Sequence, residues 1–105
     1  MSGFRPFDPN SSGGGGGVIT SMNIIEVSTS YQALITDDII VANGTLTITL
    51  PALANTTKQV AIKEIVGTLT IDGDGSETIE GSLTKTLTTG QSIVLVPTST
   101  GWVIT

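Results

Sequence analysis

The fold class of this 105-residue chain is decided by one stretch, Asn43-Gly44-Thr45-Leu46-Thr47-Ile48-Thr49-Leu50-Pro51. Threonine and a large aliphatic residue alternate strictly from Thr45 to Leu50, which predicts a β-strand with one polar and one apolar face. The Asn-Gly pair before it is the strongest short signal for a β-hairpin, because both central residues of a type I′ turn need a positive φ. Pro51 has no backbone N–H to donate and ends the strand.

Similar segments continue on both sides of this stretch, from Val18 to the last residue. Turn formers separate them, such as Thr36-Asp37-Asp38 and Thr89-Gly90, and Gly67 predicts a bend or bulge. The chain contains 18 threonines, 13 isoleucines and 8 valines, which are β-branched residues that favour sheets. We expect about eight short strands and an all-β fold, a compact antiparallel β-sandwich or barrel-like domain. The expected strands are residues 22–35, 39–41, 45–50, 60–72, 78–79, 83–88, 92–96 and 102–105, the last two forming a hairpin.

The body of the chain, residues 18–105, is small for a domain that relies on a single hydrophobic core. The sequence contains no cysteine and no histidine, which excludes a disulfide framework, thiolate or imidazole metal ligands, and catalysis by these groups. We therefore expect no cofactor, and we expect the body to bury additional area by association with copies of itself.

Charge and hydropathy narrow the possible partners. The formal net charge is −5, and the lysines Lys58, Lys63 and Lys85 are scattered, so no clustered cationic face for nucleic acid is expected. No apolar run approaches the roughly 20 residues of a membrane helix. The chain begins without a basic segment followed by an apolar one, so no secretory signal is expected.

Residues 1–17 differ from the body and form a separate leader. Both phenylalanines of the chain lie in it, beside two prolines that favour extended backbone and the only arginine. Aromatic and arginine side chains are common interface anchors, and a segment stiffened by proline loses less entropy on docking. We predict that the leader anchors the body to another protein through a flexible tether. The anchoring residues are Phe4, Arg5, Pro6, Phe7 and Pro9, and the tether is Gly13, Gly14, Gly15, Gly16 and Gly17.

The stretch Asp72–Glu80 spaces its oxygen-bearing side chains like a calcium loop. Glu77 stands where an EF-hand needs glycine, however, and Leu83 stands where it needs a bidentate glutamate. Asp-Gly and Gly-Ser pairs are also what tight β-turns require. We expect a plain turn here, with a weak cation site as the alternative, and we predict no metal-binding residues.

The sequence does not predict an enzyme. The adjacent Asp37 and Asp38 are expected to point to opposite sides of a turn rather than to share a substrate. No histidine is present to activate a serine, and Gly13–Gly17 lacks the lysine and the preceding strand of a phosphate loop.

Two threonine ladders, Thr45/Thr47/Thr49 and Thr84/Thr86/Thr88, mark polar strand faces. Threonine rows can bind ice or sugar when they repeat on a fixed rung. These rows are not expected to share such a rung, so we predict a solvated sheet face.

The body resembles the small β-domains of bacteriophage fibre and head-fibre proteins over about residues 31–104. The residues that carry the resemblance are Tyr31, Asp37-Asp38, Ile39–Val41, Asn43–Thr45, Thr47–Pro51, Val60–Lys63, Thr70–Gly73, Glu77–Gly81, Ser92–Val96 and Gly101–Ile104. Such domains are non-enzymatic homotrimers of the virion that end fibres or decorate capsids. This chain has no coiled coil or shaft, which favours a small added subunit.

The resemblance therefore implies a virion structural protein of a bacteriophage, assembled in the host cytoplasm. We expect a homotrimeric capsid decoration or head-fibre subunit that is held to a capsid or tail protein by its extended N-terminal arm. The alternative is a tail or baseplate fibre tip that binds a host receptor or glycan, with contacts from loops such as Ala52–Gln59 and Asp72–Glu77.

Overall fold

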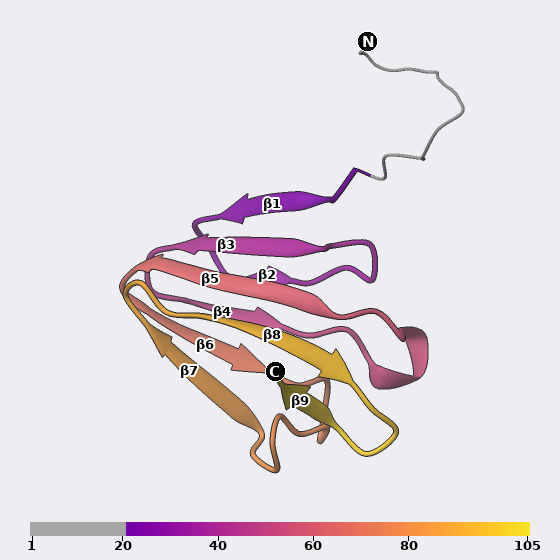
Figure 1. Cartoon of the computed structure of the whole chain (residues 1–105). Coiled ribbons are helices and arrows are strands. Elements are labelled where there is room, and N and C mark those ends of the chain that lie inside the picture. The colour runs from indigo at the N-terminus through magenta and orange to yellow at the C-terminus, as the bar shows by residue number, and fades with distance from the viewer. Residues whose placement is uncertain (1–20) are drawn as a thin grey trace, which may run out of the picture.

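Two β-sheets form the described part of the chain, residues 21–105 of the computed structural model (Figure 1). Sheet A contains, in order across the sheet, β1 (Ile24–Val27), β3 (Ile39–Asn43), β5 (Val60–Val66), β8 (Ser92–Pro97) and β9 (Trp102–Ile104). Sheet B contains β2 (Tyr31–Gln32), β4 (Leu46–Thr49), β6 (Thr68–Asp72) and β7 (Thr84–Thr88). A single 3₁₀ turn, η2 (Leu53–Asn55), interrupts the loop between β4 and β5.

The first six strands alternate between the two sheets, so the chain winds as three coils. Within sheet A, β1, β3 and β5 are parallel, and within sheet B, β2, β4 and β6 are parallel. Short corners join sheet A to sheet B on one side of the body, and longer loops return to sheet A on the other (Figure 1, left and right). The body is thus a β-sandwich in which the first six strands form coils that pass through both sheets.

The corners are built from small residues that stack on one another. Gly67, with φ 100°, lies so close to the corner above that an added Cβ would meet the Thr45 Oγ1 at 2.8 Å and the Gly44 carbonyl carbon at 2.9 Å. The Gly44 N–H donates to the Val66 carbonyl (2.9 Å), so consecutive corners are also joined by backbone hydrogen bonds. Glycine is required at Gly67 both for its positive φ and for this close approach.

The core lies between the inner faces of the two sheets. The strict alternation of β4 buries Leu46 and Ile48, as expected, and the paired Leu69 and Ile71 of β6 continue the same rows. Trp102, the only tryptophan of the chain, is 1 % exposed. The buried hydrophobic residues are Ala33, Ile40, Ala42, Leu46, Ile48, Leu50, Val60, Ile62, Leu69, Ile71, Ile79, Leu87, Leu95 and Trp102.

The chain reverses direction after β6 and completes both sheets with antiparallel strands. β7 pairs with β6, β8 pairs with β5, and β9 pairs with β8. The hairpin predicted for residues 92–105 is therefore confirmed, and its loop is closed by the Thr98 N–H, which donates to the Gly101 carbonyl (2.8 Å). The all-β prediction is confirmed as well.

The expected antiparallel arrangement is wrong for the six wound strands, and so is the hairpin at Asn43-Gly44. A type I′ turn needs two positive φ angles, but only Gly44 has one (125°), so this turn passes the chain from sheet A to sheet B. The strand expected over residues 22–35 is split by a corner at residues 28–30, where the Ser30 Oγ accepts from the Thr47 N–H (3.1 Å).

The short strand expected at residues 78–79 is also wrong, since Ile79 forms only isolated bridges with Ser82 and Trp102. The type I′ pattern occurs here instead. Glu80 (φ 52°) and Gly81 (φ 84°) both have positive φ, and the Ile79 and Ser82 backbones exchange two hydrogen bonds around them.

Candidate functional site

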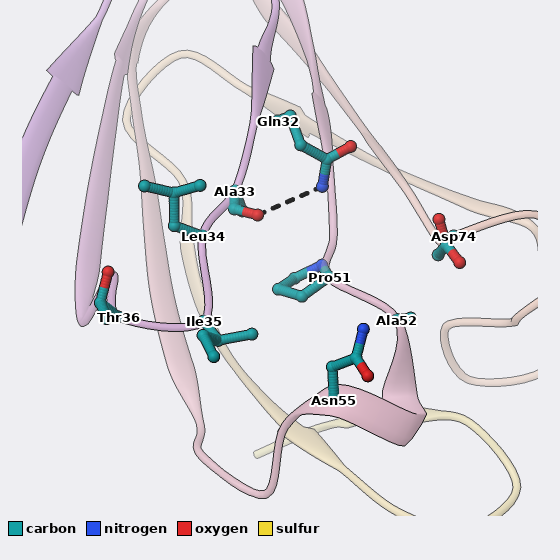
Figure 2. Close-up of a pocket in the computed structure, with 9 residues that line it drawn as sticks. All are labelled: Gln32, Ala33, Leu34, Ile35, Thr36, Pro51, Ala52, Asn55 and Asp74. Carbon is teal, nitrogen blue, oxygen red and sulfur yellow. Dashed lines mark hydrogen bonds between the residues drawn. The ribbon is translucent and has the colours of Figure 1, made fainter.

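The loops that follow β2, β4 and β6 gather at one end of the body, where they surround a depression of about 590 Å³. Figure 2 shows Pro51 between Gln32 and Asn55, with Leu34 and Ile35 on one side and Asp74 on the other. The lining residues are Gln32, Ala33, Leu34, Ile35, Thr36, Pro51, Ala52, Asn55 and Asp74. They belong to three different connections, so the winding of the chain is what brings them together.

A buried carboxylate, Asp37, holds the loop between β2 and β3 in shape. Its Oδ2 accepts from the Tyr31 hydroxyl and from the Leu34 N–H, both at 2.8 Å. Burial of the Tyr31 hydroxyl, followed by its hydrogen bond to Asp37 and the carboxylate charge, raises the pKa of Tyr31 to about 12. The backbone beside the depression is therefore fixed by a side-chain pair.

Asp38 turns away from Asp37 and takes part in a second set of contacts. Its Oδ1 pairs with the Lys58 Nζ at 2.7 Å, and its Oδ2 accepts from the Asn23 N–H at 2.7 Å. The hydrogen bond from Lys58, then that from Asn23, holds the pKa of Asp38 below its ordinary value. The two carboxylates accept hydrogen bonds from different groups, although the Lys58 Nζ also donates to the Asp37 backbone carbonyl (2.8 Å).

The loop after β6 is tied to the loop after β4 by Glu77. Its Oε1 accepts from the Leu53 N–H at 2.9 Å, while its own N–H donates to the Asp74 carbonyl (2.9 Å) and closes a turn at Gly75. Glu80 is engaged elsewhere, because its Oε2 accepts from the Ile104 N–H (2.8 Å). Residues 74–77 form a turn, as predicted, and two carboxylates of the stretch Asp72–Glu80 accept hydrogen bonds from backbone groups.

The depression combines an apolar wall with polar groups. Leu34 and Ile35 are 55 % and 50 % exposed and form the apolar wall. The side chains of Asn55 and Asp74 make no hydrogen bond with other residues of the described range, 21–105. Amide and carboxylate groups beside an apolar wall can orient a ligand that presents both hydroxyls and an apolar face.

A second surface of interest is the outer face of sheet A, which is largely aliphatic. Successive residues of a strand point to opposite faces. Because Ile40 and Ile62 face the core, the residues next to them in the chain, Ile39, Val41 and Ala61, face outward. The outward-facing aliphatic residues of the sheet are Ile24, Ile39, Val41, Ala61, Ile65, Val94, Val96 and Val103.

The outer face of sheet B is polar rather than aliphatic, because most of its residues are threonines. Thr47, Thr70 and Thr86 are paired in one row across β4, β6 and β7. Thr49 and Thr84 flank Asp72 in the next row. The expectation that the threonine rows share no rung is wrong, because parallel and antiparallel pairing bring all three strands into the same register.

The sequence predicted an anchoring leader and two contact loops, and the structure describes only the loops. The anchoring residues Phe4, Arg5, Pro6, Phe7 and Pro9, and the tether Gly13–Gly17, lie outside the described residues. The two loops named for surface contacts, Ala52–Gln59 and Asp72–Glu77, do meet, since Ala52, Asn55 and Asp74 line the same depression.

Sequence reasoning missed the apolar outer face of sheet A, although a signal for it exists. Residues 39–41 and 93–96 are continuous aliphatic runs rather than alternating ones, and such runs are typical of strands that are covered on both faces. It also missed Leu34 and Ile35 in the depression, for which the sequence carries no comparable signal.

Comparison with known proteins gives no family for the chain: no protein-family model, curated protein or solved structure matches it. Among residues 21–105, no helix is long and apolar enough to cross a membrane.

Proposed function

We propose that the chain is a non-enzymatic structural protein of a bacteriophage virion, a homotrimeric capsid decoration or head-fibre subunit. Its N-terminal leader binds a capsid or tail protein, and the β-body projects from the attachment point. The proposal is supported by the resemblance of residues 31–104 to phage fibre and head-fibre domains and by the composition of the leader.

One observation carries the proposal: both phenylalanines of the chain stand in the leader and none in the body. Among residues 21–105, fourteen buried hydrophobic residues form the core, and the sequence of the body, residues 18–105, contains no phenylalanine. Phe4 and Phe7 stand in a leader that also holds the only arginine and is separated from the body by five glycines. Two aromatic rings and an arginine in one short segment are suited to anchor it in a pocket on another protein.

Deleting residues 2–12 tests the attachment. The truncated chain is expected to fold and to keep the association state of the full chain, measured by circular dichroism and light scattering, but to be absent from purified particles. A double variant, Phe4→Ala with Phe7→Ala, is expected to lose incorporation too, whereas Ser11→Ala with Ser12→Ala serves as the matched control. Unchanged incorporation of the truncated chain would refute the anchoring role of the leader.

A second candidate function, a fibre tip that binds a host receptor or glycan, is favoured by the depression at the loop end. Asn55 and Asp74 supply polar groups there, beside exposed Leu34 and Ile35. The double substitution Asn55→Ala with Asp74→Ala is expected to reduce binding of the purified protein to host cells at least about tenfold, since two hydrogen-bonding groups are removed. If the wild-type protein does not bind host cells, this candidate is excluded.

A further inference from the structure

The outer face of sheet A is apolar across most of its width. The in-register pairing places Ile24, Ile39, Ala61 and Val94 in one row over four neighbouring strands. The next row toward the loop end holds the paired Val96 and Val103. A sheet that faces water on one side normally alternates apolar and polar residues, so a row of this kind indicates a face that is covered.

The two sheets of this body provide an internal comparison. Sheet B presents threonine outward at most positions, including Thr47, Thr70 and Thr86. Sheet A has the same strand geometry and the same β-branched preference, yet it presents isoleucine and valine. High sheet propensity alone does not explain the difference, because threonine satisfies that propensity as well. The aliphatic choice is specific to sheet A.

The aliphatic face has the dimensions of the centre of an interface. Five strands spaced about 4.8 Å apart span about 20 Å, and the rows from Val96 to Ile65 cover about 20 Å along the strands. The resulting area is about 400 Å² and includes the row of Glu26, Lys63 and Ser92. It equals the largest apolar patches of typical monomers, which are often functional, and a stable interface must bury further area around it. Ile24, at one edge, is 65 % exposed.

The charges on this face are self-complementary. Glu26 and Lys63 lie in one row, on either side of Val41, so one carboxylate and one ammonium group stand two strands apart. Glu26 forms no ion pair with any other residue of the described range, and the Lys63 Nζ donates to the Gly90 carbonyl at 2.7 Å. A second copy of the same face can bring its carboxylate to this ammonium group, whereas a uniformly charged partner would be repelled by one of the two.

A small residue lies at the centre of the row formed by Ile24, Ile39, Ala61 and Val94. β5 is the middle strand of sheet A, and its outward residue Ala61 stands between the larger Ile39 and Val94. A small residue on the middle strand allows neighbouring backbones to approach each other closely.

We propose that the outer face of sheet A is the surface through which copies of this chain associate, with three such faces around a shared axis and Ala61 nearest to it. This inference rests on the homotrimer of the proposed function and adds the interface that forms it. The Glu26 carboxylate of one copy lies toward the Lys63 ammonium group of the next.

The test compares one charge placed on each sheet of the full-length chain. Ala61→Glu puts a carboxylate at the centre of the sheet A face, and Thr70→Glu puts it at the half-buried centre of the sheet B face as the matched control. Sedimentation and light scattering are expected to show a trimer for the wild type and for Thr70→Glu. Ala61→Glu is expected to sediment as a folded monomer, with association weakened at least about a hundredfold by the unpaired charge.

A cross-linking experiment keeps the test decisive if Ala61→Glu fails to fold. Because the chain contains no cysteine, Ala61→Cys and Thr70→Cys each introduce a unique thiol. A short bismaleimide is expected to join copies of Ala61→Cys and to leave Thr70→Cys uncross-linked. Absence of cross-links at position 61, or equal cross-linking at both positions, overturns the assignment of this face.

The possible outcomes separate the interface from the proposed function. If the wild type and both glutamate variants are trimers, the chain associates through another surface and the trimer of the proposed function stands. If both glutamate variants are monomers, the loss is not specific to sheet A and the inference fails. A wild type that stays monomeric at high concentration refutes both the interface and the trimer, while incorporation into particles still tests the leader separately.

Discussion

Glu64 is the least expected residue of the core, because it is a carboxyl group buried among aliphatic side chains. It is 0 % exposed, and neither of its side-chain oxygens has a hydrogen-bond partner. Burial raises the pKa of Glu64, and the nearby N–H groups of Ile65 and Val66 offset only part of this. The folded state therefore favours the protonated carboxyl.

The direction of the resulting pH dependence follows from linkage. A carboxyl whose pKa is higher in the folded state stabilises the fold fully below its unfolded pKa, here 4.5, and loses that contribution as the pH rises toward the folded value. Glu64→Gln is expected to flatten the stability curve above pH 4.5 and to raise the free energy of unfolding at pH 7 by about 1 kcal/mol. Urea denaturation at a series of pH values measures both.

The chain is suited to this measurement because it contains no histidine, which would titrate in the same range. Lys63→Gln, on the outward side of the same strand, is the control and should keep the slope of the wild type. A wild-type stability that is constant between pH 5 and pH 8 would contradict the assignment of a protonated Glu64.

Gly67 and Gly90 allow the effect of close packing to be separated from that of backbone conformation. Both have positive φ, but a Cβ would collide with the neighbouring corner only at Gly67 and would meet open space at Gly90. Gly90→Ala is expected to cost about 1–2 kcal/mol through φ alone. Gly67→Ala should cost at least about 1 kcal/mol more through overpacking. Equal losses in denaturant titrations would show that the corners do not stack as described.

At the scale of elements, the loop between β2 and β3 depends on the Tyr31–Asp37 hydrogen bond. Tyr31 is the only tyrosine of the chain, so its ionisation can be followed by ultraviolet absorbance. We expect a midpoint near pH 12 in the wild type, and in Asp37→Asn a midpoint closer to the ordinary value of 10, because the carboxylate charge is removed.

The same pair contributes to stability in a defined window. The raised pKa of Tyr31 means that its contribution is complete below pH 10 and is lost as the pH rises toward 12. Tyr31→Phe removes the hydroxyl but keeps the ring, and it should abolish this loss. Asp38→Asn is the control for a neighbouring carboxylate that does not contact the hydroxyl, and a lowered tyrosine midpoint in that variant would contradict the assignment.

At the scale of the whole molecule, calcium is not expected to stabilise the fold. Glu77 and Glu80, within the calcium-like stretch, already accept hydrogen bonds from the Leu53 and Ile104 N–H groups. We expect the melting temperature to be unchanged by a chelator and by millimolar calcium. An increase of several degrees with calcium would show that a ligand binds the native state, because such binding shifts unfolding by mass action.

Local features of the fold were predictable from the sequence, and the path of the chain was not. The alternation at Leu46, Ile48 and Leu50 identified the buried face of β4, and the hairpin of β8 and β9 followed from its turn residues. The winding did not follow, because an Asn-Gly turn can close a hairpin or pass the chain to another sheet. Which of these occurs depends on partners far away in the sequence.

The coils also differ in length, so no fixed sequence repeat indicates that the chain is wound. Ile24, Ile39 and Ala61 are paired in register, yet they are 15 and 22 residues apart, so no constant period marks the coils. The depression could be predicted only in part. The turn-rich loops were recognisable as contact regions, but their meeting at Ala52, Asn55 and Asp74 is a product of the coil geometry.

The asymmetry between tight corners and long return loops has a consequence for protein engineering. On the corner side, β5 and β6 are separated by a single residue, Gly67, which leaves no room for inserted sequence. On the opposite side, the connections of residues 33–38, 50–59 and 73–83 all emerge from one end of the body (Figure 1). Foreign peptides grafted there would be presented side by side, on the same pole of the scaffold, without altering the coils beneath them.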